Sequence, residues 1–166
     1  PEKLRPLFAD ALVIDDEVRH QLSVSMGFAQ LADVQSGNDA IKNAYPSKDY
    51  DDLMAGVDAA LAKGFIDEKN LFVCGGSGGG VLTAWTVGHT DRFAVGVPER
   101  FSFDYLSAYG EDQWWVWYQS ELGSPFENED LYRRLSPGTY LKNVKTPLYL
   151  IANEDAKNCP LPQVLQ

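Results

Sequence analysis

Apolar residues recur every three or four positions between residues 50 and 61, which predicts an amphipathic helix with one buried stripe. The stripe consists of Tyr50, Leu53, Met54, Val57 and Leu61. Ser47 or Asp49 is expected to cap its N-terminus, because short polar side chains accept hydrogen bonds from the first free amides of a helix. Lys63 followed by Gly64 is a typical end for such a helix.

Three short apolar runs without polar alternation predict strands. Residues 71–74 form the first run, and its continuous apolar character favours a strand buried on both faces, as in a parallel sheet. Glycine and serine residues fill positions 75–80, and residues 81–87 predict a second helix. Residues 94–97 predict the next strand, and residues 148–151 predict a final buried strand. The alternation indicates an α/β fold with a mostly parallel sheet flanked by helices.

Other segments carry weaker patterns. Residues 101–135 are rich in aromatic side chains and are expected to form an irregular, partly helical excursion from the sheet. Residues 12–14 predict a short strand, and residues 19–48 predict loops and a short helix. A length of 166 residues favours one domain spanning residues 1–166.

Composition narrows the class of function. The formal net charge of −10 argues against nucleic-acid binding, and no apolar run approaches the ~20 residues that a membrane helix needs. Cys74 and Cys159 belong to no CxxC pair, so no metal site is expected. A disulfide between them stays open. The favoured interpretation is two buried free thiols in a reduced compartment, which points to the cytoplasm and otherwise leaves the localisation unknown.

The segment from Gly75 to Gly79 fits the G-x-S-x-G pattern of a nucleophile elbow, with a predicted strand before it and a helix after it. Such a turn holds the nucleophile, here Ser77, in a strained conformation with its hydroxyl above the sheet. Small residues at Gly75 and Gly79 are expected to let strand and helix approach closely. The backbone N–H of Gly78, at the positive end of the helix, is the expected oxyanion donor.

Other interpretations of the glycine-rich turn are weaker. A phosphate-binding loop needs Gly-Lys-Ser/Thr at its end, and no lysine occurs between Asn70 and Lys142. A dinucleotide-binding turn would need a third glycine where Val81 stands. A turn without any chemistry stays an alternative, because glycine-rich turns are common.

Several sequence blocks in order along the chain resemble the catalytic domain of the prolyl oligopeptidase family, especially its acylaminoacyl-peptidase and dipeptidyl-aminopeptidase branch. The blocks are Lys48-Asp49-Tyr50-Asp51-Asp52-Leu53-Met54, Gly75 to Trp85, Thr90-Asp91-Arg92-Phe93, Ser136-Pro137, Asn143-Val144-Lys145-Thr146-Pro147 and Cys159-Pro160. The resemblance covers roughly residues 39–162. Residues 1–38 match poorly, and Gly27-Phe28 is their one similarity to a family Gly-Tyr/Phe-Gly turn.

The resemblance implies an α/β-hydrolase fold, a Ser-Asp-His triad in that chain order and no cofactor. It implies a serine peptidase that releases short N-terminal units from small peptides, with Ser77 as nucleophile. The aromatic residues Trp114, Trp115 and Trp117 fall where the family builds a wall of the substrate side-chain pocket. Plain core packing is the equally weighted alternative for these three residues.

The chain departs from the family at the triad acid and at the following turn. Where the family has His-Gly, this chain has Ala152-Asn153. Counting back from Pro160, the acid position falls on Ala156, whereas Asp155 lies one residue early. A shift of one residue in this loop would bring Asp155 into place, so Asp155 is the tentative triad acid.

The triad histidine has no candidate in the chain. Only His20 and His89 occur, and His89 lies about 18 Å along the second helix from Ser77 at 1.5 Å per residue. His20 precedes the nucleophile, contrary to the order of this fold. Both are interpreted as ordinary surface or packed residues, and the family histidine is expected beyond Gln166. The fold is therefore expected to be incomplete at both ends, with unpaired strand edges that favour self-association as a homo-oligomer.

Three hypotheses follow. The first is a serine peptidase acting on short, acylated or aminoacyl peptides through an acyl-enzyme on Ser77, with this chain alone weak or inactive for want of a base. The second is a degenerate, non-catalytic domain that serves as a structural or interaction module, as Ala152, Asn153 and Ala156 suggest. The third is a carboxylesterase of the same fold.

Overall fold

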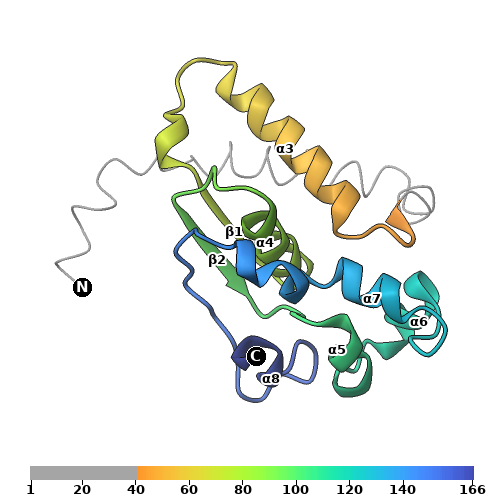
Figure 1. The fold of residues 1–166 in the computed structure, drawn as a ribbon. Coiled ribbons are helices and arrows are strands. Elements are labelled where there is room, and N and C mark those ends of the chain that lie inside the picture. The colour runs from red at the N-terminus through yellow and green to blue at the C-terminus, as the bar shows by residue number, and fades with distance from the viewer. Residues whose placement is uncertain (1–40) are drawn as a thin grey trace. The chain divides into compact units, whose positions relative to one another are not determined.

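The computed structural model describes residues 41–166, which form one contact unit (Figure 1). The expectations for residues 12–14, for the turn at Gly27-Phe28, for His20 and for residues 19–40 lie outside the described part. In chain order the elements are α3 (Ser47–Leu61), η2 (Glu68–Asn70), β1 (Phe72–Gly76), α4 (Gly78–His89), β2 (Val95–Glu99), α5 (Tyr105–Glu111), α6 (Trp115–Leu122), α7 (Glu129–Leu135), η3 (Pro137–Asn143) and α8 (Pro162–Leu165).

A parallel sheet lies at the centre of the described unit. Strand β1 pairs with β2 in parallel from Phe72↔Val95 to Gly76↔Glu99, and α4 connects the two strands. Residues 148–151 run along the other side of β2, where parallel bridges join Leu148 to Gly96 and Ile151 to Glu99. The predicted α/β arrangement with a parallel sheet and flanking helices is confirmed.

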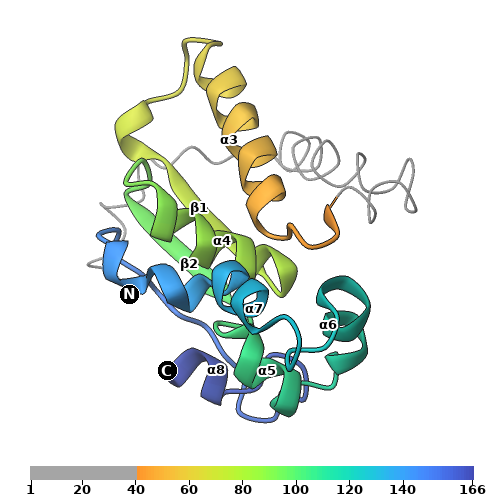
Figure 2. The same cartoon turned by 45° about the vertical axis from the view of Figure 1, so that its right-hand side comes forward.

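The predictions that residues 71–74 are buried on both faces and that residues 148–151 form a buried strand are wrong. Val73 is buried, whereas its neighbour Phe72 is 45% exposed and Tyr149 is 68% exposed. Alternate side chains of a strand point to opposite faces of a sheet. Helix α4 packs on one face of β1 and β2 (Figures 1 and 2). Val73 packs with Val87 of α4 and therefore points to this face. No other described element covers the opposite face, so the apolar runs are half exposed.

The long helix α3 lies at the surface of the described unit. Tyr50, Met54 and Val57 of the predicted stripe pack against buried clusters, but no residue of α3 is itself buried. The helix begins after Pro46 without a side-chain cap, so the predicted cap at Ser47 or Asp49 is wrong. Gly64 follows the end of the helix with φ +78°, a left-handed conformation that favours glycine.

Aromatic residues build the larger core, between α4 and the three helices α5, α6 and α7 (Figure 2). Tyr105, Tyr118 and Tyr132 are almost fully buried and pack ring against ring, with centroids 5.4 Å apart for Tyr105–Tyr118 and 6.5 Å for Tyr118–Tyr132. The predicted partly helical excursion over residues 101–135 is confirmed. Within residues 41–166, no helix combines the length and the apolar character that crossing a membrane would demand.

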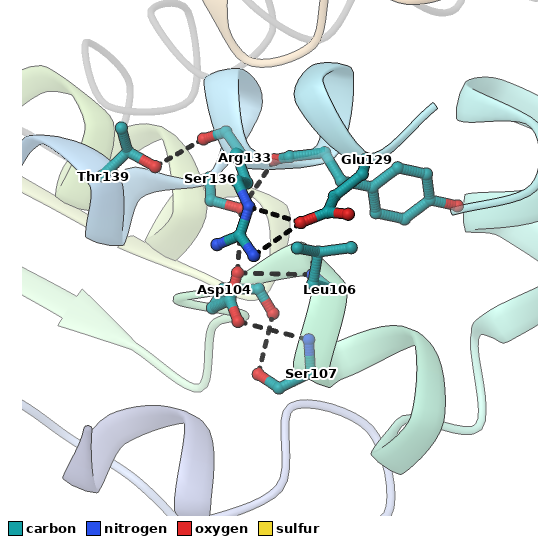
Figure 3. A network of polar contacts seen from close by, with 8 residues as sticks. Asp104, Leu106, Ser107, Glu129, Arg133, Ser136 and Thr139 are labelled. Carbon is teal, nitrogen blue, oxygen red and sulfur yellow. Dashed lines mark hydrogen bonds and ion pairs between the residues drawn. The ribbon is translucent and has the colours of Figure 1, made fainter. Parts of the chain in front are cut away.

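A polar junction fixes the start of α5 against the end of α7 (Figure 3). Asp104 caps α5 and accepts hydrogen bonds from the amides of Leu106 and Ser107 at 3.3 and 3.2 Å. The buried Ser136 hydroxyl accepts from the Tyr105 amide at 2.9 Å and donates to the Tyr132 carbonyl at 2.7 Å. The Tyr105 amide has no acceptor within its own helix, so Ser136 satisfies it.

We expect Ser136→Ala to lower the free energy of unfolding by about 1–3 kcal/mol, because it leaves the buried Tyr105 amide without a partner. Urea denaturation followed by circular dichroism measures the change. Ser120→Ala is the matched control, since the Ser120 hydroxyl is exposed and bonds only to a carbonyl of its own helix. Equal stability of the two variants would contradict the role of Ser136.

Candidate active site

Ser77 is the single residue that links the end of β1 to the start of α4, and its backbone has φ 56° and ψ −120°. Positive φ is costly for a residue with a side chain, and the surrounding backbone holds it in place. The Ser77 amide donates to the Glu99 carbonyl at 2.9 Å, and the Ser77 carbonyl accepts from Gly80 and Val81 at 2.9 and 3.0 Å. Ser77 is exposed, so a strained residue presents its hydroxyl at the surface.

Two glycines let helix and strand meet at this bend. A Cβ on Gly75 would lie 2.5 Å from the carbonyl carbon of Gly79, and a Cβ on Gly80 would lie 2.5 Å from the Glu99 carbonyl oxygen. A Cβ on Gly79 would meet nothing within 4 Å. The prediction that small residues let strand and helix approach closely is therefore right for Gly75 and wrong for Gly79. Gly80, rather than Gly79, lies on the side of the helix that faces the sheet.

Gly78 is the first residue of α4, so its N–H has no acceptor within the helix and lies at the positive helix end. Tyr45 supports the same residue from outside, since its hydroxyl donates a 2.6 Å hydrogen bond to the Gly78 carbonyl. Burial raises the pKa of Tyr45 well above its usual value, which keeps the phenol protonated as a donor. The Gly78 N–H thus follows Ser77 directly at the start of α4, and its role as an oxyanion donor stays a prediction.

An open pocket of about 440 Å³ lies beside Ser77. Its lining is mostly polar and comes from the ends of β1 and β2, the start of α6 and residues 153–159. The lining consists of Ser77, Arg100, Gln113, Asn153, Asp155, Ala156, Lys157, Asn158 and Cys159. No group of three or more potential metal ligands gathers within residues 41–166.

Backbone strain concentrates at this pocket. Four residues other than glycine have positive φ in the described part, and three of them, Ser77, Arg100 and Cys159, line it with φ of 56°, 46° and 53°. Each such residue costs of the order of 1–3 kcal/mol and persists only where the surrounding structure fixes it. Strain of this kind gathers at functional sites, so the pocket is the candidate active site.

The tentative triad acid Asp155 lines the pocket and is exposed. Ala156, which stands where the resemblance places the acid, lines the pocket next to it. The structure thus brings Ser77 and Asp155 to one pocket, and the role of Asp155 stays a prediction.

Trp114, Trp115 and Trp117 do not line the pocket that contains Ser77. Trp114 and Trp115 lie half exposed at the start of α6, whereas Trp117 packs edge-on against Tyr45 and Tyr105. Their assignment as a substrate wall stays a prediction, and Trp117 contributes to the core through these two rings.

His89 lies at the far end of α4 from Ser77. Its ring stacks on Trp85 with centroids 4.1 Å apart, and its Nδ1 lies 2.8 Å from the Trp85 carbonyl oxygen. His89 is exposed and packs on Trp85, which agrees with its interpretation as an ordinary surface or packed residue.

Sequence reasoning missed two residues at this site: Arg100, which lines the pocket, and Asp112, which bonds to the lining residue Cys159. Asp112 is only 5% exposed and ties three segments together. Its carboxylate accepts hydrogen bonds from the Trp114 amide at 2.9 Å, the Cys159 amide at 3.3 Å and the Ser102 hydroxyl at 3.4 Å. The acidic pair Glu111-Asp112 inside an aromatic-rich segment was the only signal in the sequence. Asp112 therefore fixes Cys159, the strained residue at the end of the loop that carries Asp155.

The two cysteines are free and differ in environment. Cys159 is buried as expected, but Cys74 is exposed, because it points away from the face of the sheet that α4 covers. Burial raises the pKa of the Cys159 thiol, which makes it a poor nucleophile at neutral pH.

Comparisons with known proteins agree with the geometry of the bend. Residues 35–166 match the Prolyl oligopeptidase family. The chain is 38% identical over 131 residues to a Bacillus subtilis (strain 168) protein described as "Uncharacterized peptidase YuxL", covering 76% of this chain and 20% of that protein. Among solved structures, acylaminoacyl peptidase of Pyrococcus horikoshii matches with a TM-score of 0.71 and 32% identity over 76% of this chain and 21% of that one. Puromycin hydrolase matches with a TM-score of 0.72 and 26% identity, over 78% of this chain and 20% of that one. The chain therefore spans about a fifth of the length of these proteins.

We expect Gly75→Ala and Gly80→Ala each to lower the free energy of unfolding by about 2 kcal/mol or more, because the added methyl group overlaps backbone atoms. Gly79→Ala is the matched control. Its methyl group meets open space, and alanine favours a helix over glycine by about 1 kcal/mol, so its stability should be unchanged or higher. Urea denaturation measures all three variants. A loss of stability in Gly79→Ala as large as in Gly80→Ala would contradict the close approach of α4 to the sheet at Gly80.

We expect Asp112→Ala to expose Cys159. Labelling by a disulfide reagent, measured in a Cys74→Ser background, should be slow in the parent and at least about tenfold faster after Asp112→Ala, because the amide of Cys159 loses its acceptor. Asp130→Ala, a change of the same charge at the start of α7, is the control. An unchanged labelling rate in Asp112→Ala would show that other contacts hold the loop.

Proposed function

The chain belongs to the prolyl oligopeptidase family, and from this we propose that residues 41–166 carry the nucleophile part of a serine peptidase site. The proposed reaction is hydrolysis of short peptides, or of acylated or aminoacyl peptides, through an acyl-enzyme on Ser77. The observation that carries the proposal is the strained, exposed Ser77 between a parallel strand and a helix, next to the free N–H of Gly78.

In the proposed reaction the Ser77 hydroxyl oxygen attacks the carbonyl carbon of the scissile bond while a base accepts the hydroxyl proton. The carbonyl oxygen becomes negative and receives a hydrogen bond from Gly78 N–H. The tetrahedral intermediate then expels the amine, which takes the proton from the base and leaves an acyl-enzyme. Attack by water, with its proton again taken by the base, releases the acid and restores Ser77.

Asp155 is the proposed acid that would orient the base. No histidine within residues 41–166 lies at the pocket, since His89 is held at the far end of α4. The chain alone is therefore expected to react slowly, because a serine hydroxyl without a base stays protonated.

A second candidate function is a non-catalytic module derived from a hydrolase. The observation that favours it is Ala156, which lines the pocket at the position where the resemblance places the acid. A carboxylesterase activity would use the same Ser77 chemistry, and comparing an aminoacyl amide with a short acyl ester as substrate separates it from a peptidase.

Reaction with a fluorophosphonate probe tests the proposal directly. We expect slow labelling of the full chain, confined to Ser77, with a rate that rises with the concentration of added imidazole. Imidazole supplies the missing general base, and the Gly78 N–H stabilises the developing negative oxygen. Intact-mass spectrometry measures the rate, and peptide mapping locates the label.

Ser77→Ala is the first control and should remove both the label and the effect of imidazole. His89→Ala is the second and should leave both unchanged, because His89 packs on Trp85 away from the pocket. A Ser77 that stays unlabelled at every imidazole concentration would favour the non-catalytic module. Rapid labelling without imidazole would contradict the expectation that the chain alone reacts slowly.

A further inference from the structure

Arg100 occupies an unusual place at the end of β2. It follows Glu99 directly, has φ 46° and donates its amide to the Ile151 carbonyl at 2.8 Å. An arginine gains nothing from a left-handed backbone that glycine would adopt at lower cost. We therefore expect the Arg100 side chain to have a function at the pocket.

The guanidinium group lies beside the residue that precedes the nucleophile. Its Nε is 2.9 Å from the Glu99 Oε1, and a Cβ placed on Gly76 would lie 3.5 Å from its Nη2. The side chain is 47% exposed, and Glu99 is its only ion-pair partner within residues 41–166. Glu99 orients the guanidinium, and most of the five N–H donors of arginine stay available to a ligand.

The rest of the pocket suits an anionic ligand. Lys157 adds a second positive charge, and Gln113, Asn153 and Asn158 add amide donors, against one lining carboxylate, Asp155. Glu99 and Asp155 balance the charges of Arg100 and Lys157, so the pocket is close to neutral on a chain whose formal net charge is −10. A pocket that holds two cationic side chains is where such an acidic protein can attract a negative group.

We propose that Arg100 is a specificity-determining residue and that it binds a carboxylate on the acyl part of the substrate, as in a peptide or an N-acyl amino acid whose reacting residue is Asp or Glu. A guanidinium meets a carboxylate through two parallel hydrogen bonds, a geometry that an uncharged amide cannot match. That the bound molecule is a substrate rests on the proposed function of Ser77, whereas the binding of a carboxylate by Arg100 does not depend on it.

Titration of the full chain with N-acetyl-L-glutamate and N-acetyl-L-glutamine tests the proposal, because both ligands carry an α-carboxylate and they differ only in the γ group, a carboxylate in one and an amide in the other. We expect the glutamate ligand to bind at least about tenfold more tightly than the glutamine ligand, because one charged hydrogen-bonded pair contributes a gain in affinity of this size. Amide chemical shifts in NMR spectra measure the affinity, and shifts at Gly76, Arg100 and Lys157 locate the ligand. Equal affinity for the two ligands, or no binding of the glutamate ligand, would overturn the proposal.

Arginine variants sharpen the result. Arg100→Gln should remove the preference for the glutamate ligand, and Arg100→Lys should keep only part of it, because lysine lacks the planar pair of donors. Arg133→Gln is the control, since Arg133 is also exposed and paired with a glutamate but lies on α7 outside the pocket. It should keep the full preference. A preference that survives Arg100→Gln, in a variant with an unchanged circular dichroism spectrum, would refute the assignment to Arg100.

The same titration with Ser77→Ala separates this inference from the proposed function. The preference for the carboxylate should persist without the nucleophile, because Arg100 and Lys157 remain in place. If fluorophosphonate labelling fails and the preference stands, the binding site survives and the peptidase proposal falls. If labelling succeeds and the preference is absent, Arg100 has no such role and the peptidase proposal survives.

Discussion

The first turn of α4 passes so closely over the ends of β1 and β2 that no side chain fits at Gly75 or Gly80. This approach forces Ser77 into a left-handed conformation and lets its amide bond to the Glu99 carbonyl. The strain costs of the order of 1–3 kcal/mol, and the buried packing of α4 on the sheet offsets it. Without that contact, neither the exposed hydroxyl of Ser77 nor the free N–H of Gly78 would have a fixed position.

Parallel pairing explains why the pocket collects residues from distant parts of the sequence. The carboxyl ends of parallel strands meet at one edge of a sheet, where ligands of open α/β folds bind. Ser77 follows β1, Arg100 follows β2, and the loop 153–159 follows the segment that bridges to β2. Asp112, from the end of α5, ties this loop to the start of α6. Three strained residues and one buried carboxylate thus give the pocket a defined shape.

The sequence predicted the features that depend on neighbours in the chain. Periodic apolar residues located α3, and the glycine-rich bend located Ser77, because both signals are local. Burial of Phe72 and Tyr149 was predicted wrongly, since an apolar run does not reveal which faces of a sheet are covered. Arg100 and Asp112 were missed, because their roles depend on contacts with residues far away in the sequence.

The strain at Ser77 is the central claim, and the stabilities of Ser77→Gly and Ser77→Ala test it most directly. Both variants lose the hydroxyl, but only glycine adopts φ 56° and ψ −120° without steric cost. Urea denaturation should show Ser77→Gly to be more stable than Ser77→Ala by about 1 kcal/mol or more. A Ser77→Ala variant as stable as Ser77→Gly, or more stable, would mean that the backbone at this bend is relaxed and would contradict the account.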